Sequence, residues 1–194
     1  VVVVNRRSLK MAHPKLKEVI HADFLDLSPI EAQRGGYDAC FHCMGVSAVG
    51  MSEEDYTRFT YTLTKNLADL LHGINPAMVF NYVSGTGSDS SEKSPVMWAR
   101  VKGRTENMLL AKGFKDAYMF RPGAIIPKKG VQPSSKIYSR AIRYLGWLIT
   151  VIKAIAPSSV VDTVQIGQTM IDLNTRPYEK KVLLPKDILQ IANR

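Results

Sequence analysis

One stretch constrains the fold of this chain more than any other, and it runs from Asn81 to Pro127. A run of β-forming residues, Met78 to Val83, ends in small hydroxyl residues, and a polar loop then leads into an amphipathic segment. A second β-forming run, Ala117 to Phe120, ends in Arg-Pro-Gly. This order predicts a β-α-β unit. Parallel strands joined in this way end at one edge of a sheet, so we expect a ligand crevice at that edge.

Several side chains with useful chemistry meet at this predicted edge. Ser84 and Thr86 follow the first strand, Arg121-Pro122-Gly123 follows the second, and Lys102 reaches the edge from the helix between them. The simpler interpretation is turn chemistry, since Ser-Gly-Thr-Gly and Arg-Pro-Gly are both typical of strand-ending turns. The order and spacing of the three groups favour a functional site.

Hydroxyl residues after one strand, an aromatic-x-x-x-Lys pattern from Trp98 to Lys102, and Arg-Pro-Gly after the next strand resemble an atypical short-chain dehydrogenase/reductase. The chain is similar to small NAD(P)-binding proteins of the NAD-dependent epimerase/dehydratase-like type and to the Tat-interacting-protein group, over nearly its whole length from Val1. The resemblance implies an α/β Rossmann-like fold with a doubly wound parallel sheet. Residues 1–127 would form the NAD(P)-binding core, and residues 128–194 would add substrate-side helices and a last strand to the same domain.

The family's first strand and its glycine-rich turn have no counterpart in this sequence. They would precede the run Val1 to Val4, yet the first glycine is Gly35. That turn places the pyrophosphate on a helix N-terminus. We therefore expect the sequence to begin inside the fold, after a segment of about 25 to 30 residues, the length of a strand-turn-helix unit. The alternative is a molecule without the phosphate cradle.

The run Val1 to Val4 predicts a buried parallel strand, and it is followed by Asn5, Arg6 and Arg7. By the resemblance, this strand ends near the adenosine ribose. An acidic residue there binds the 2′-hydroxyl, whereas arginine accommodates a 2′-phosphate. The sequence therefore favours NADP over NAD as cofactor, and two solvated arginines at a strand end are the simpler alternative.

The resemblance implies three further cofactor contacts, each at the end of a predicted strand. They are Asp23 and Phe24, which would meet the adenine; Gly45 and Val46, which would border the ribose or nicotinamide; and Pro122, Gly123 and Ala124, whose backbone would meet the nicotinamide carboxamide. From the residues alone, Asp26 and Ser28-Pro29 are helix-start signals. His42 lies inside a strand, which favours a structural role.

In the family a tyrosine exchanges the substrate proton, and a lysine four residues later lowers the pKa of that tyrosine and holds the nicotinamide ribose. Lys102 matches the lysine, but Trp98 occupies the tyrosine position, and an indole cannot exchange a proton at useful pH. Thr86, Ser84, Tyr82 or a lysine-held water could supply the proton, with Thr86 slightly ahead of Ser84. Alternatively the site binds NADP without turnover, as a sensor or scaffold, or Trp98 shapes an aromatic pocket for other chemistry.

Composition adds bounds. The 194 residues are 45% hydrophobic, enough for one substantial core. A net charge of +9, with no acidic residue from Ala117 to Val161, favours an anionic ligand beside the crevice, or else a solvated basic face; we expect no nucleic acid partner. Cys40 and Cys43 are predicted to be buried thiols of a cytoplasmic protein, and no metal site is expected, because no second ligand pair exists.

The rest of the chain predicts five further elements. They are a helix from Gly50 to Gly73, capped by Ser52 and ended by Gly73; an apolar helix from Ala141 to Ala156; a helix from Val160 to Leu173; and a last strand within Lys180 to Leu184, before a short terminal helix. The 16 residues from Ala141 fall short of the roughly 20 that span a bilayer. We expect them to cover the crevice or form a homodimer contact; peripheral membrane attachment is the alternative.

These observations predict an NADP-dependent oxidoreductase or epimerase-like protein that acts on a small carbonyl, alcohol or sugar-like substrate. A regulatory or scaffold protein that binds NADP is the competing class.

Overall fold

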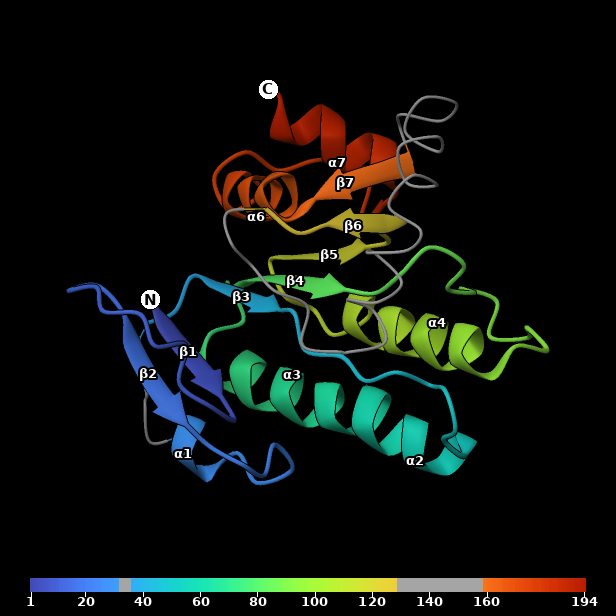
Figure 1. Cartoon of the computed structure of the whole chain (residues 1–194), viewed down its shortest axis with the longest axis horizontal. Coiled ribbons are helices and arrows are strands. Elements are labelled where there is room, and N and C mark those ends of the chain that lie inside the picture. Colours follow the sequence, from blue (N-terminus) through green and yellow to red (C-terminus); the bar gives the residue numbers. More distant parts are fainter. Residues whose placement is uncertain (32–35, 129–158) are drawn as a thin grey trace.

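A computed structural model describes residues 1–31, 36–128 and 159–194 (Figure 1). Every paired strand in this part of the chain runs parallel to its neighbour, so the expected α/β class with parallel strands is confirmed. The described strands form three separate ladders rather than one continuous sheet: β1 (Val2–Asn5) with β2 (Lys17–Ile20); β3 (Ala39–His42), β4 (Val79–Val83), β5 (Asp116–Phe120) and β8 (Val182–Leu183) in that order; and β6 (Ala124–Ile126) with β7 (Val160–Asp162).

The four-stranded sheet is covered on both faces, because alternate residues of a strand point to opposite sides. Val79 and Tyr118 pack against α6 (Thr163–Asp172) and α7 (Pro185–Ala192). Phe80 and Met119 pack against α3 (Leu63–Ile74) and α4 (Met97–Leu110). Figure 1 shows these helix pairs on opposite sides of β4 and β5. This is the predicted doubly wound arrangement, with one hydrophobic core on each face.

The predicted helix from Gly50 to Gly73 forms as three consecutive segments: α2 (Glu53–Thr57), a π-helical turn η1 (Arg58–Thr62) and α3. Ser52 caps it as expected, and its hydroxyl accepts from the Asp55 amide at 3.1 Å. The predicted end at Gly73 is wrong. The helix continues to Ile74, and Asn75 is the C-cap, its amide bonded to the Leu71 carbonyl at 2.9 Å. Gly73 does not take the positive φ that ends a helix.

The predicted helix from Val160 to Leu173 begins three residues late. Val160 and Val161 are β-branched and buried, and they belong to strand β7. Asp162 then caps α6 by accepting from the amides of Val164 and Gln165, at 2.9 and 2.8 Å. The last strand and the terminal helix are present as β8 and α7.

The predicted membrane or dimer contact of the apolar segment is not tested by the described residues. The apolar segment from Ala141 to Ala156 lies outside the described residues, so its membrane contact and dimer contact stay predictions. Within the described ranges, no helix has the length and apolar character needed to cross a bilayer.

Cys40 and Cys43 are free thiols, but Cys43 is exposed, because β3 already ends at His42. The expectation that both are buried is wrong for Cys43.

Candidate functional site

The ends of β4 and β5 are bound to each other beyond the last strand residues. The Ser84 amide donates to the Phe120 carbonyl at 2.7 Å, and the Thr86 amide donates to the Pro122 carbonyl at 3.0 Å. The Thr86 hydroxyl donates to the Arg121 carbonyl at 2.9 Å. The structure thus brings the two predicted groups together, as expected for neighbouring parallel strands. Residues 84–86 and 121–123 form one wall at the ends of β4 and β5.

Lys102 reaches this wall from α4. Its Nζ donates to the Ser84 carbonyl at 3.1 Å and lies 5.8 Å from the centre of the Tyr82 ring. Burial lowers the pKa of the ammonium, and the charge of Glu106, one helical turn further on, opposes this effect. No carboxylate forms an ion pair with Lys102 among the residues that the structure describes. A desolvated cation without a carboxylate partner is typical of a functional site.

The candidate hydroxyl groups differ in access. Ser84 is buried, its Oγ lies 2.8 Å from the Ser88 Oγ, and Ser88 donates to the Gly85 carbonyl at 2.9 Å. These bonds within the turn match the simpler interpretation of Ser84, a residue that stabilises the turn. Thr86 is exposed. Tyr82 is only 1% exposed, and burial raises the pKa of its phenol. The geometry therefore favours Thr86 over Ser84 and Tyr82 for contact with a substrate.

Trp98 packs on the turn that carries these hydroxyls. Gly87 has a φ of 94°, and a Cβ at this position would lie 3.0 Å from Cη2 of the Trp98 indole. The half-buried indole therefore lies directly over the Gly87 backbone. The position that the resemblance assigns to a proton-exchanging tyrosine holds a side chain that packs against the backbone.

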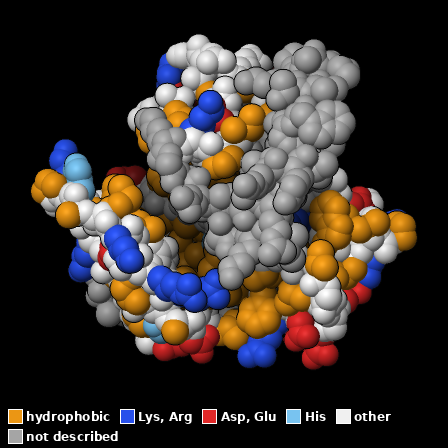
Figure 2. Space-filling model, in the orientation of Figure 1, with side chains coloured by type: hydrophobic (Ala, Val, Ile, Leu, Met, Phe, Trp, Pro, Cys, Tyr) orange, Lys and Arg blue, Asp and Glu red, His pale blue; other side chains and the backbone are white. Residues whose placement is uncertain are grey.

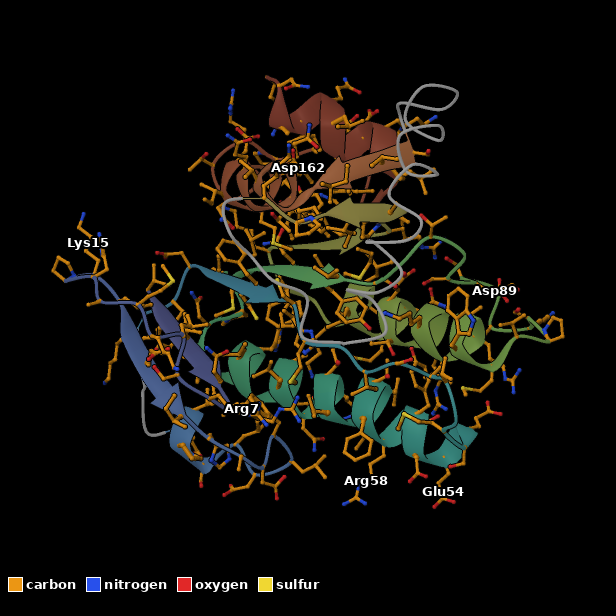
Figure 3. All side chains as sticks on the ribbon, viewed as in Figure 1. Arg7, Lys15, Glu54, Arg58, Asp89 and Asp162 are labelled. Atoms are coloured by element: carbon orange, nitrogen blue, oxygen red, sulfur yellow. The ribbon has the colours of Figure 1, made fainter. Side chains whose placement is uncertain are left out.

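Gly103 lets the loop after Thr86 lie against α4. A Cβ on Gly103 would sit 1.7 Å from the Asp89 carbonyl oxygen, and the Asp89 amide donates to the Ala99 carbonyl at 3.0 Å. Asp89, labelled in Figure 3, also accepts from the amides of residues 91, 93 and 94. This contact between the loop and α4 was not predicted from the sequence. The glycine at position 103, inside a helix and directly after Lys102, was the signal that could have indicated it.

A buried ion pair joins α4 to the end of β5. The Glu106 side chain is fully buried, and Arg121 is 14% exposed. The Arg121 Nε lies 3.0 and 3.1 Å from the two carboxylate oxygens, Nη2 also donates to Glu106, and Nη2 donates to the Ser90 hydroxyl at 2.6 Å. Arg121 belongs to the stretch 117–161, which has no acidic residue and whose cations were expected to favour an anionic ligand. That assignment is wrong for Arg121, because Glu106 neutralises it.

The predicted adenosine-side residues lie at the ends of β1 and β2. Arg6 and Arg7 are exposed beyond β1 (Arg7 is labelled in Figure 3), and Asn5 has a buried Nδ2 with no partner in the described part of the chain. The Asp23 carboxylate accepts from the Leu25 amide at 2.9 Å. The next residue, Phe24, is half-buried. Figure 2 shows a recess lined by hydrophobic side chains beside the β1–β2 unit, with Lys and Arg side chains at its margin.

The helix-start interpretation of the segment after β2 is confirmed. The Asp26 carboxylate accepts from the Ser28 amide at 3.0 Å, and the short helix α1 (Ser28–Glu31) begins there. Gly45 and Val46 are exposed after β3. Within β3, His42 is 5% exposed, with ring centres 6.1 Å from Phe80 and 5.4 Å from Tyr82, which fits the predicted structural role.

Close packing requires a glycine at Gly123, in the segment that the resemblance assigns to the nicotinamide. A Cβ there would lie 2.5 Å from the Ser159 carbonyl oxygen and 3.8 Å from the Thr86 Oγ1. Pro122 is buried, Gly123 is exposed, and Ala124 starts β6. The backbone at Gly123 thus lies directly beside the Thr86 hydroxyl.

The chain is similar to known proteins in its fold and not in its sequence. No protein-family model and no curated protein matches the sequence. Solved structures do match the fold. Among them are dTDP-4-dehydrorhamnose reductase from Yersinia enterocolitica (13% identity, TM-score 0.60, covering 94% of this chain and 72% of that chain) and ADP-L-glycero-D-manno-heptose-6-epimerase from Helicobacter pylori (15%, 0.61, 99% and 72%). RMD from Pseudomonas aeruginosa, complexed with NADPH, also matches (16%, 0.56, 86% and 67%).

This chain has the fold of these reductases and epimerases. The resemblance to atypical short-chain dehydrogenases/reductases is confirmed at the level of the fold, since identities of 13% to 16% carry no more than that.

One structure of this fold is complexed with NADPH, so a nicotinamide dinucleotide is the ligand to compare with the residues of this chain. At the ends of β4 and β5 they fit its ribose–nicotinamide part: the ammonium of Lys102 suits ribose hydroxyls, and the exposed backbone at Gly123 suits a carboxamide. The pyrophosphate cradle of that fold is a glycine-rich turn before a helix. No described helix follows such a turn at the end of β1 or β2. The residues in hand therefore fit one half of the cofactor.

Proposed function

We propose that the chain carries the nicotinamide half of an NADP-dependent reductase or epimerase that acts on a small carbonyl, alcohol or sugar-like substrate. The observation that supports this most is the desolvated ammonium of Lys102, which has no carboxylate partner in the described ranges and is bonded to the carbonyl of Ser84, two residues before exposed Thr86. Among the solved structures of similar fold, one is named a reductase and two are named epimerases, and RMD is complexed with NADPH.

Each residue of the wall has a role in this proposal. A nicotinamide dinucleotide, when bound, supplies or accepts the hydride. Lys102 binds the ribose hydroxyls, and the backbone at Pro122 and Gly123 orients the carboxamide. The exposed Thr86 hydroxyl accepts a hydrogen bond from a substrate hydroxyl, because its own hydrogen is donated to the Arg121 carbonyl. Trp98 covers the turn and limits access of water to it.

The preference for NADP over NAD rests on Arg6 and Arg7. Both guanidinium groups are exposed beyond β1 and form no ion pair within the described residues. A 2′-phosphate held by charge-assisted hydrogen bonds contributes about 1.5 to 3 kcal/mol, so NADPH should bind at least about tenfold more tightly than NADH.

A titration of NADPH and NADH tests this preference. The double variant Arg6→Ala/Arg7→Ala should bind NADPH no more tightly than NADH, while its affinity for NADH stays within about twofold. Arg58→Ala removes an exposed arginine of helix segment η1 and is the matched control. Equal affinity of the unaltered protein for both dinucleotides would reject the preference.

A second candidate is NADP binding without turnover, in a regulatory or scaffold protein. The packing of Trp98 on Gly87 favours it, because this indole fills the place of the proton-exchanging phenol. Screening small carbonyl substrates with the unaltered protein and with Trp98→Tyr separates the two candidates. The regulatory candidate predicts that only Trp98→Tyr turns over substrate, although both bind NADPH.

A further inference from the structure

The reduction of a carbonyl needs a proton, and the hydroxyl groups at this site are committed elsewhere. The Ser84 hydroxyl is buried and paired with the Ser88 hydroxyl at 2.8 Å. The Thr86 hydroxyl donates its only hydrogen to the Arg121 carbonyl at 2.9 Å. The Tyr82 phenol is buried and bonded to Thr105, and burial raises its pKa. None of these three groups has a proton available for transfer to a substrate.

The ammonium of Lys102 has protons to give. It carries three hydrogens, and one of them is donated to the Ser84 carbonyl at 3.1 Å. Ser84 precedes Thr86 by two residues, and Thr86 is the exposed hydroxyl of the wall. The ammonium is thus bonded to the backbone two residues before the exposed hydroxyl.

No group that faces Lys102 forms an ion pair with it in the described part of the chain. Glu106, on α4 itself, is held by Arg121 from the end of β5. Tyr82 faces it from β4, and His42 from β3. Burial lowers the pKa of His42 to about 4, so the imidazole is neutral at pH 7. Burial also lowers the pKa of Lys102, which makes its proton easier to transfer.

We propose that Lys102 is the catalytic acid and base of the reaction, in the place where the resemblance leads one to expect a tyrosine. This rests on the proposed function. In the reducing direction, an N–H bond of the ammonium breaks and an O–H bond forms on the substrate carbonyl oxygen, while the carbonyl carbon accepts the hydride of the reduced dinucleotide. The products are the alcohol, the oxidised dinucleotide and a neutral amine at Nζ, which regains its proton from water.

The test compares Lys102→Arg with Lys115→Arg, an exposed lysine after α4. Arginine keeps the positive charge but does not give up a proton at accessible pH. With 4-nitrobenzaldehyde and NADPH as the probe, Lys102→Arg should bind NADPH within about threefold of the unaltered protein. Its turnover should fall by about 10² to 10⁴-fold, the usual contribution of a general acid. Lys115→Arg should leave both quantities unchanged.

Two further measurements guard against a misfolded variant. Adding Trp98→Tyr to Lys102→Arg supplies a phenol beside a cation and should restore part of the turnover. In the unaltered protein, lysine Nζ signals followed by NMR should show one ammonium that titrates below the ordinary value of about 10.4 and is absent in Lys102→Arg. The reduction rate should fall as pH rises through that same titration, because the protonated form is the reactant.

The outcomes separate this inference from the function on which it rests. Failure of the unaltered protein to bind NADPH would overturn the proposed function. NADPH binding with no reduction of the probe at any pH, or turnover of Lys102→Arg within tenfold of the unaltered protein, would overturn the acid and base role of Lys102 alone.

Discussion

At the scale of single residues, two helical glycines face opposite constraints. Alanine is favoured over glycine in a helix interior by about 1 kcal/mol. Gly167 in α6 has open space where a Cβ would go, so Gly167→Ala should raise the free energy of unfolding by about that amount. Gly103 in α4 has the Asp89 carbonyl 1.7 Å from the same point, so Gly103→Ala should lower it by about 3 kcal/mol or more. Urea unfolding of both variants measures the two signs, and a gain at position 103 would show that the loop does not pack on α4.

His42 makes stability depend on pH. Burial lowers its pKa to about 4, below the value of about 6.5 in an unfolded chain. As pH falls from about 6.5 to 4, the unfolded state binds the proton and the folded state does not. The contribution of His42 to the free energy of unfolding is therefore lost over that window and is constant above it. The loss from this residue should approach about 3 kcal/mol. Urea unfolding at pH 7, 6, 5 and 4 should show a shallower loss in His42→Leu; equal slopes would contradict the assignment.

At the scale of elements, the pair formed by Glu106 and Arg121 fastens α4 to the end of β5. Removing one partner of a buried pair leaves a charge without compensation and costs about 3 to 5 kcal/mol. We expect that loss for Glu106→Leu, and recovery of most of it in Glu106→Leu/Arg121→Met. The exposed pair of Lys65 and Asp69 is the control, since Lys65→Ala should change stability by less than about 0.5 kcal/mol. Equal effects at the two pairs, measured by chemical unfolding, would show that Glu106 is not buried in solution.

At the scale of the whole molecule, bound NADPH should stabilise the fold, because it binds the native state and not the unfolded chain. At a concentration of 100 times the dissociation constant, the gain is about 2.7 kcal/mol. For a chain of this length that raises the melting temperature by roughly 5 to 10 °C. Thermal unfolding with and without NADPH measures the shift, with NADH at the same concentration for comparison. No shift with either dinucleotide would contradict cofactor binding.

The sequence was sufficient for the parallel β-α-β unit and for most of the wall built on it. Ser84, Thr86, Lys102 and Pro122 meet as predicted, because strand ends and a helix of known direction leave them little freedom. It was insufficient for the pair of Glu106 and Arg121, for the packing of Trp98 on Gly87, and for the strand status of Val160 to Asp162. Each of these depends on a neighbour distant in the sequence, which local patterns do not specify.

The sequence by itself determined the alternation of strands and helices, and hence the edge at which polar residues gather, because periodicity and strand ends are local properties of the chain. Only the tertiary structure decided which of those residues are free to act. Contacts between separate segments occupy Thr86 and Arg121, burial shields Ser84 and Tyr82, and the ammonium of Lys102 is left without a carboxylate partner in the described residues. A group's reactivity is set by the solvation and charges around it, and those come from the fold.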